Sequence, residues 1–317
     1  MPRIGSCAEA AAIAGGNDGV RLVGTYVEAP LTWAVSAGAA SRHTSVASLQ
    51  YGAIGISRIG SGSHVMAVVM AEQAGWLPPA AGAAAEAPSS SSNNRSSSSS
   101  SDDNAGDAAV SRLPGVPLAF VTLNDFRGLR DGVNSGRADA FLWETFTTKV
   151  RLSRPRLPGN ALAAADRPPH GPLSPPVLPT RTQPYHDSKE LRRIGEIRAP
   201  WAAFMVAARA DLLDMDAKAV QRLLAAVNVA TARFSAGTAT GASQAYVAKT
   251  FGQQPADVEA WFRTVRYPAD AHVVSRPMLQ TCLDSLRRAR LVPDAVDIAS
   301  LVDARVAIVT DLDISAA

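Results

Sequence analysis

The sequence has few cysteines, no long apolar run and no large excess of one charge. Its only two cysteines, Cys7 and Cys282, are far apart and fit neither a metal-site nor a redox spacing, so we expect free thiols in a reducing compartment. No apolar run reaches the ~18 residues that a membrane helix needs. The apolar start carries Glu9 and no basic run before it, unlike a secretory signal peptide. We therefore expect a soluble, cytoplasmic protein without a membrane span.

The balance of charges argues against a nucleic-acid partner. The 31 Lys and Arg residues nearly match the 28 Asp and Glu residues, which leaves a net charge of +3, and there is no Lys/Arg run. The histidines are scattered along the chain, so neither a metal site nor a cofactor is predicted, and no specific protein partner is indicated. The hydrophobic content of 47% is ample for the core of one or two domains.

Two segments have the composition of disordered insertions within a domain. Residues 78–112 include the polar tract "SSSSNNRSSSSSSDDN", which cannot offset the entropy lost on ordering. Residues 151–184 are rich in proline and basic residues and show no periodicity. Both are predicted to be inserted loops rather than parts of the core.

Outside these segments, strand and helix patterns alternate. Short apolar runs bounded by turn residues predict strands, and apolar residues at helical spacing predict the helices between them. The predicted strands are 20–27, 51–56, 117–122, 138–144 and 191–197, and the predicted helices among them are 64–76 and 124–137. Such alternation is typical of an α/β fold with a mainly parallel sheet. From residue 211 the pattern becomes helical, over 211–236, 241–252, 254–265 and 275–290.

The stretch "GISRIGSGSHVM", residues 55–66, is a polar, glycine-rich turn between a strand and a helix. It fails the spacing rules of a dinucleotide fingerprint, a Walker phosphate loop and a nucleophile elbow. It has the composition of an anion-binding turn, since helix-start amides, serine hydroxyls and an arginine can all face an oxyanion. The candidate ligand residues are Ser57, Arg58, Gly60, Ser61, Gly62, Ser63 and His64. The alternative is that Ser61 or Ser63 only caps the helix and Arg58 is solvated.

Several longer motifs, in order, carry a family resemblance. They are "LVGTYVEAPLTWAVSAG", "GISRIGSGSHVMAVVMAEQAGW", "NDFRGLRDGVNSGRADAFLWETFTTK", "LRRIGEIRAPWAAFMVAA" and "VRYPAD". With them the chain resembles the eukaryotic, chiefly fungal, periplasmic-binding-protein-like family. That family is similar in fold to the type 2 substrate-binding proteins of sulfonate and nitrate uptake and to the thiamine-pyrimidine synthase family.

The resemblance implies two α/β lobes joined by two crossing strands, with a ligand in the cleft and closure by hinge bending. Lobe I would comprise residues 1–40 and 201–317, and lobe II residues 41–200, with crossings near 31–38 and 201–208. Family members begin with a strand and a helix before the first motif seen here. We therefore expect the N-terminal part of lobe I to be missing, and its sheet to have an open edge.

Further cleft residues follow from this arrangement. Trp143 and Glu144 end a strand where sulfonate-class relatives carry a Trp-Asp pair, so the indole can stack on a ligand, and the carboxylate can either accept from its N–H or brace the hinge. Trp143 is equally compatible with core packing. Asn124 is either a helix cap or a cleft donor, and Tyr26 and Glu28 end a lobe I strand. With the glycine-serine turn, these residues complete the predicted site.

The resemblance implies non-catalytic binding of a small anionic or heteroaromatic metabolite. The alternative is a thiamine-pyrimidine-synthase-like enzyme, but such enzymes depend on a cysteine-rich motif and a cofactor-bearing lysine. This chain has two cysteines, and its first lysine is Lys149. A third hypothesis is a truncated copy that acts only as an interaction protein through its inserted loops.

Overall fold

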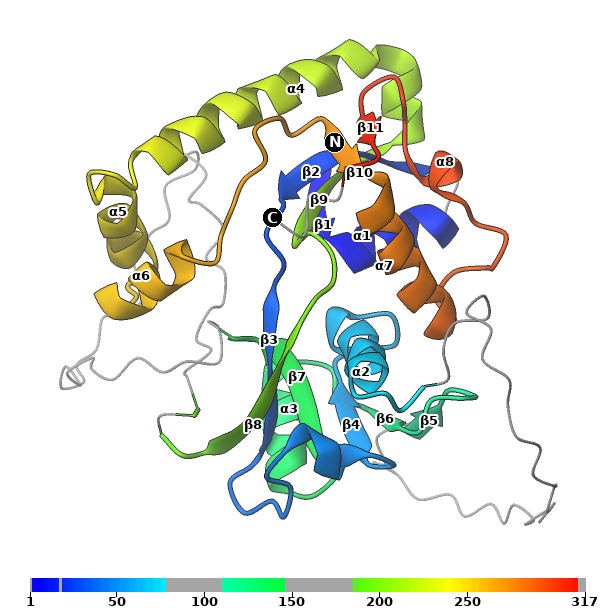
Figure 1. Ribbon diagram of the computed structural model, residues 1–317, viewed down its shortest axis with the longest axis vertical. Helices are drawn as coiled ribbons and strands as arrows, with labels where there is room; N and C mark the ends of the chain where they lie inside the picture. Colours follow the sequence, from blue (N-terminus) through cyan, green and yellow to red (C-terminus); the bar gives the residue numbers. More distant parts are fainter. Residues whose placement is uncertain (1, 17–18, 78–109, 146–184, 187, 313–317) are drawn as a thin grey trace, which may run out of the picture.

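In the described part of the chain, a small and a large β-sheet are connected by two chain crossings, helices pack on both, and a separate pair of short strands lies beside the small sheet (Figure 1). The structure is a computed structural model and describes residues 2–16, 19–77, 110–145, 185–186 and 188–312. The chain passes from the small sheet to the large sheet at residues 28–31 and returns at 199–203.

The large sheet has six strands in the order β5-β6-β4-β7-β3-β8. Their bounds are β5 (Val110–Arg112), β6 (Ala119–Thr122), β4 (Ala53–Ile56), β7 (Ala140–Glu144), β3 (Thr32–Gly38) and β8 (Leu191–Arg198). Only β4 pairs in parallel, with β6 and β7, and the other pairs are antiparallel. The expectation of a mainly parallel sheet is therefore wrong, because β3 and β8 enter and leave this sheet against the direction of the βαβ strands.

Helices cover both faces of the large sheet. α2 (Gly62–Gln73) lies on one face and α3 (Phe126–Asn134) on the other, and the short helix η1 (Val46–Leu49) precedes β4. The alternation along β7 follows from the strand period of two: Ala140 and Leu142 join the cluster around α2, whereas Phe141 and Trp143 join the cluster around α3.

The small sheet has three antiparallel strands in the order β1-β9-β2. Its strands are β1 (Arg3–Ser6), β9 (Phe204–Arg209) and β2 (Val20–Val27). α4 (Ala210–Ala236) packs on one face, and α1 (Cys7–Gly16) and α7 (Arg276–Arg288) pack on the other. The remaining elements are α5 (Ala242–Phe251), α6 (Pro255–Phe262), α8 (Ile298–Leu301) and the parallel pair β10 (Val273–Ser275) and β11 (Ile308–Thr310).

α2 is buried on every side, because it also contacts the helices of the small sheet. Residues 63–71 are all buried in consecutive order, which is typical of a helix enclosed by protein. At its C-terminal end Glu72 accepts a hydrogen bond from Ser285 (3.0 Å) and pairs with Arg288 (3.3 Å), both on α7. One apolar cluster therefore extends from the large sheet through α2 to α1 and α7.

Several predicted elements agree closely with the structure, and some were not predicted. The α/β architecture is confirmed, and α4 to α7 lie within one to three residues of their predicted bounds. β1 and α1 were not predicted. The last three residues of the predicted insertion 78–112 form β5, because the edge of β6 accepts a further antiparallel strand there. Residues 78–109 and 151–184 lie outside the described residues.

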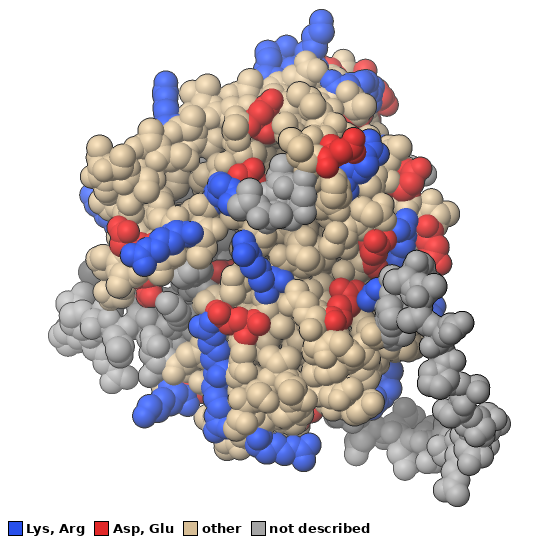
Figure 2. Space-filling model, viewed as in Figure 1, with Lys and Arg blue, Asp and Glu red and all other residues tan. Residues whose placement is uncertain are grey.

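The surface and the helices bear on two of the sequence expectations. Figure 2 shows basic and acidic side chains interspersed over the viewed face. In the described part of the chain, no helix combines the length and apolar character required to cross a membrane.

Candidate ligand pocket beside the chain crossing

The glycine-serine turn between β4 and α2 is closed by hydrogen bonds among its own residues. The Ser57 amide donates to Ser63 Oγ (3.0 Å), the two hydroxyls of Ser61 and Ser63 lie 2.9 Å apart, and Ser61 Oγ donates to the Arg58 carbonyl (2.7 Å). Ser61 is the N-cap of α2, with its side chain accepting from the His64 amide. These donors and acceptors therefore serve first to start the helix.

His64 completes the turn from inside the protein. Its Nδ1 accepts from the Gly60 amide (3.1 Å), and its ring packs edge-on against Phe120 with the centroids 4.6 Å apart. Nε2 is buried without a hydrogen-bond partner. Burial lowers the pKa of His64 to about 4, so the ring is neutral at pH 7. His64 is thus a neutral core residue that holds Gly60 in place.

Two glycines set the shape of this turn. Gly60 has a φ of +79°, a conformation that an L side chain rarely adopts. A Cβ at Gly62 would lie 2.7 Å from the Trp33 ring. The indole of Trp33 therefore covers the start of α2, and Trp33 is also the strand partner of Glu144. Trp33 thereby connects the turn with the end of β7.

A pocket of about 170 Å³ opens beside the crossing between the two sheets. Residues of β2 and the segment after it form one wall, the end of β7 and the start of β9 form another, and the segment after α6 closes it. The lining residues are Tyr26, Val27, Ala29, Pro30, Leu31, Thr32, Glu144, Phe204, Trp261, Thr264, Val265 and Tyr267. Four aromatic rings and one carboxylate make this a largely apolar site with a single acidic group.

Contacts around the pocket hold its polar groups in position. Tyr26 and Tyr267 meet edge to face with their ring centroids 5.6 Å apart. Burial, with a smaller contribution from Tyr26, raises the pKa of Tyr267 to about 12, so its hydroxyl stays protonated. Behind this wall Glu28 pairs with Arg266, and the Glu28 amide donates to the Arg266 carbonyl (3.0 Å). Glu28 therefore fastens the segment after α6 to the end of β2.

The predicted site residues fall into three groups. Tyr26 and Glu144 line the pocket, and Glu28 braces it. Residues 57–64 form the capped turn beneath Trp33. Trp143 and Asn124 lie with α3 instead: Trp143 packs on Phe126 (5.4 Å between ring centroids), and Asn124 has a left-handed backbone (φ +68°). The cap of α3 is Asp125, which accepts from Gly128.

Apart from Tyr26 and Glu144, the lining residues were not predicted, and the unpredicted ones include the three aromatic residues Phe204, Trp261 and Tyr267. The signal was present in part, because Tyr267 lies in "VRYPAD", one of the motifs that carried the family resemblance. Trp261, which lines the same pocket, was predicted only as part of a helix. Among the described residues, no three His, Cys, Asp or Glu side chains gather as a metal site.

Comparisons with known proteins bear on the fold. A family model described as Ca3427-like PBP matches residues 33–111. The Candida albicans CA3427 gene product, described as having the generic periplasmic-binding-protein fold, superposes with a TM-score of 0.65 at 23% identity, over 99% of this chain and 82% of that one. The chain has the periplasmic-binding-protein fold.

A second solved structure has the same fold. The alkanesulfonate-binding protein SsuA from Xanthomonas axonopodis pv. citri, bound to MOPS, gives a TM-score of 0.55 at 14% identity, over 95% of this chain and 80% of that one. The family model and these two structures confirm the predicted resemblance to type 2 periplasmic-binding-protein-like proteins. No curated protein matches the chain.

Proposed function

We propose that this periplasmic-binding-protein-like chain binds a small heteroaromatic metabolite in the pocket beside the crossing and does not convert it. The observation that carries the proposal is the lining of the pocket, in which Tyr26, Phe204, Trp261 and Tyr267 surround one carboxylate, Glu144. Aromatic faces favour a flat ring, and a carboxylate accepts from a ring N–H or amino group.

The size of the pocket supports a single ring. An apolar cavity of about 150 Å³ holds one benzene molecule, and this pocket measures about 170 Å³. A neutral or protonated aminopyrimidine-type ring would fill it, with its amino group toward Glu144. An anionic ligand is less suited, because the lining contains a carboxylate, and several donors of the glycine-serine turn are already engaged within the turn.

The two sheets with their helices correspond to the two lobes in this proposal, with the boundaries at residues 28–31 and 199–203. Closure would bend the chain at these crossings. Since α2 packs both on the large sheet and against α1 and α7 of the small sheet, we expect the movement to be small and to concern mainly the wall formed by Thr264 and Tyr267.

Calorimetric titration of the full chain with 2-aminopyrimidine tests the proposal, with methanesulfonate as the anionic comparison. We expect 2-aminopyrimidine to bind and to be recovered unchanged. Glu144→Gln removes a charged acceptor worth roughly 1.5–3 kcal/mol, so affinity should fall by about 10- to 100-fold. The matched control is Glu72→Gln, because Glu72 is a half-buried carboxylate outside the pocket. This variant should bind 2-aminopyrimidine as the unmodified chain does.

Arg58→Ala separates the two parts of the predicted site. Under this proposal it leaves the affinity for 2-aminopyrimidine unchanged. The opposite result would be that methanesulfonate binds, that Arg58→Ala abolishes this binding and that Glu144→Gln does not. That result would place an anion at the glycine-serine turn instead. Absence of binding by 2-aminopyrimidine would refute the ring assignment.

A further inference from the structure

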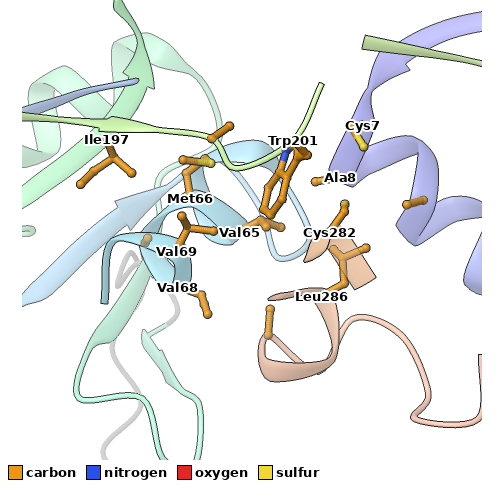
Figure 3. Packing of buried hydrophobic residues seen from close by; sticks show 14 of the residues in the cluster. Cys7, Ala8, Val65, Met66, Val68, Val69, Ile197, Trp201, Cys282 and Leu286 are labelled. Atoms are coloured by element: carbon orange, nitrogen blue, oxygen red, sulfur yellow. The ribbon is translucent and has the colours of Figure 1, made fainter. Parts of the chain in front are cut away.

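Four sulfur atoms from three different elements meet in the core of the small-sheet half. Cys7 Sγ lies 3.5 Å from Met205 Sδ on β9 and 3.7 Å from Met278 Sδ on α7. Cys282, one helical turn beyond Met278 on the same face of α7, belongs to the same buried cluster as Cys7. Both cysteines are free thiols, and all four side chains are at most 1% exposed. Figure 3 shows Cys7 on α1 and Cys282 on α7 with Trp201 beside them.

The spacing of these sulfurs suits a bound ion. A metal–sulfur bond of about 2.3 Å in a trigonal site of three sulfurs places neighbouring sulfurs ~4.0 Å apart, the edge length of that triangle. The two distances from Cys7 Sγ to the methionine sulfurs, 3.5 and 3.7 Å, need to increase by only a few tenths of an ångström to reach it.

The kinds of donor select the ion. Thiolate and thioether sulfur are soft ligands that favour Cu(I), whereas Zn(II) sites are built from thiolate, imidazole and carboxylate. One thiolate with Cu(I) is electrically neutral, which suits an apolar core in which an uncompensated charge would be costly. Binding releases one thiol proton and involves no change of oxidation state.

We propose that Cys7, as the thiolate, and the thioethers of Met205 and Met278 form a Cu(I)-binding site between α1, β9 and α7, beside which Cys282 remains a neutral thiol. The site is independent of the ligand pocket and of the proposed metabolite. Since its ligands are buried, the ion enters when α1 opens locally or when the chain folds, so loading is faster during refolding than into the folded protein.

The test refolds the full chain without oxygen in the presence of Cu(I) held by bicinchoninate, and measures how much copper the protein withdraws. We expect one Cu(I) per chain and a higher melting temperature with copper than without it. Met278→Leu keeps the core volume but removes a ligand. Loss of a group that merely orients a ligand costs about 10- to 100-fold in metal affinity, so loss of the ligand itself should cost at least about tenfold.

Met66→Leu is the matched control, because Met66 is buried in the same apolar cluster on α2 without belonging to the sulfur group. It should bind copper as the unmodified chain does. Met205→Leu provides a second ligand variant if Met278→Leu does not fold. Failure of the unmodified chain to withdraw copper would overturn the proposal. The proposal would also be overturned if a folded Met278→Leu or Met205→Leu variant bound Cu(I) as tightly as the unmodified chain, because copper would then be held by a thiol alone.

Discussion

His64 should make the protein less stable in mild acid, and the size of the loss follows from its surroundings. The ring is 1% exposed, accepts from Gly60 at Nδ1 and lies against Phe120. Protonation breaks the Gly60 bond and places a charge in the core. Burial lowers the pKa of His64 from 6.5 to about 4 in the folded protein, whereas the unfolded chain keeps a value near 6.5.

The sign follows from which state binds the proton more readily. Below pH 6.5 the unfolded chain takes up a proton at His64 and the folded chain does not until about pH 4. Stability from the neutral ring is therefore present above pH 6.5 and is lost as the pH falls toward 4. A pKa shift of this size corresponds to a total loss of about 3 kcal/mol in the free energy of unfolding, of which about 2 kcal/mol is already lost at pH 5.

Urea unfolding at pH 7, 6, 5 and 4.5 measures this loss, and His64→Asn is the reference. The asparagine Oδ1 can replace Nδ1 as acceptor for Gly60 but does not titrate, so carboxylates and the other histidines affect both chains alike. We expect His64→Asn to be less stable than the unmodified chain at pH 7, because the ring contacts are lost. The difference in unfolding free energy between the two chains should narrow by about 2 kcal/mol at pH 5. A gap that stays constant with pH would refute the burial argument.

Two further substitutions test contacts around the pocket. Gly62→Ala drives a methyl group into the Trp33 ring and should cost about 1–3 kcal/mol of stability by overpacking, which lowers the melting temperature by ~2–4 °C per kcal/mol. Adding Trp33→Phe to this variant should recover most of the lost stability. An unaffected melting temperature in Gly62→Ala would contradict the close contact. Arg266→Met leaves the largely buried Glu28 carboxylate without its arginine partner and should cost about 1–3 kcal/mol in urea unfolding. Adding Glu28→Gln to Arg266→Met should reduce that loss. If the two substitutions instead lowered the free energy of unfolding additively, the interaction between Glu28 and Arg266 would be refuted.

The sequence predicted the helices well where apolar residues recur at helical spacing with clear ends, as in α7, which begins at the cap Ser275 and ends near two arginines. α1 escaped prediction because "CAEAAAIAGG" is built mostly from small residues and has no distinct polar face. The parallel core of β4, β6 and β7 could be predicted from alternation, but the antiparallel pairing of β3 and β8 depends on the path of the chain between the sheets.

The site was harder to predict than the fold, for a physical reason. Whether Ser63 faces a ligand or the Ser57 amide depends on a single side-chain rotamer, which composition does not determine. The pocket combines Tyr26, Glu144 and Tyr267 from three distant segments, and only tertiary structure brings them together. The same holds for Cys7 and Cys282, whose sequence spacing indicated no relationship.

The enclosure of α2 by both halves has a consequence for how the protein melts. Val65, Met66 and Val69 on α2 belong to the same apolar cluster as Cys282 and Leu286 on α7 (Figure 3). If the small-sheet helices came apart first, this side of α2 would be left in water, and the large sheet would lose much of the support that α2 provides. We therefore expect the two sheets, although they look like separate bodies, to unfold together rather than one after the other.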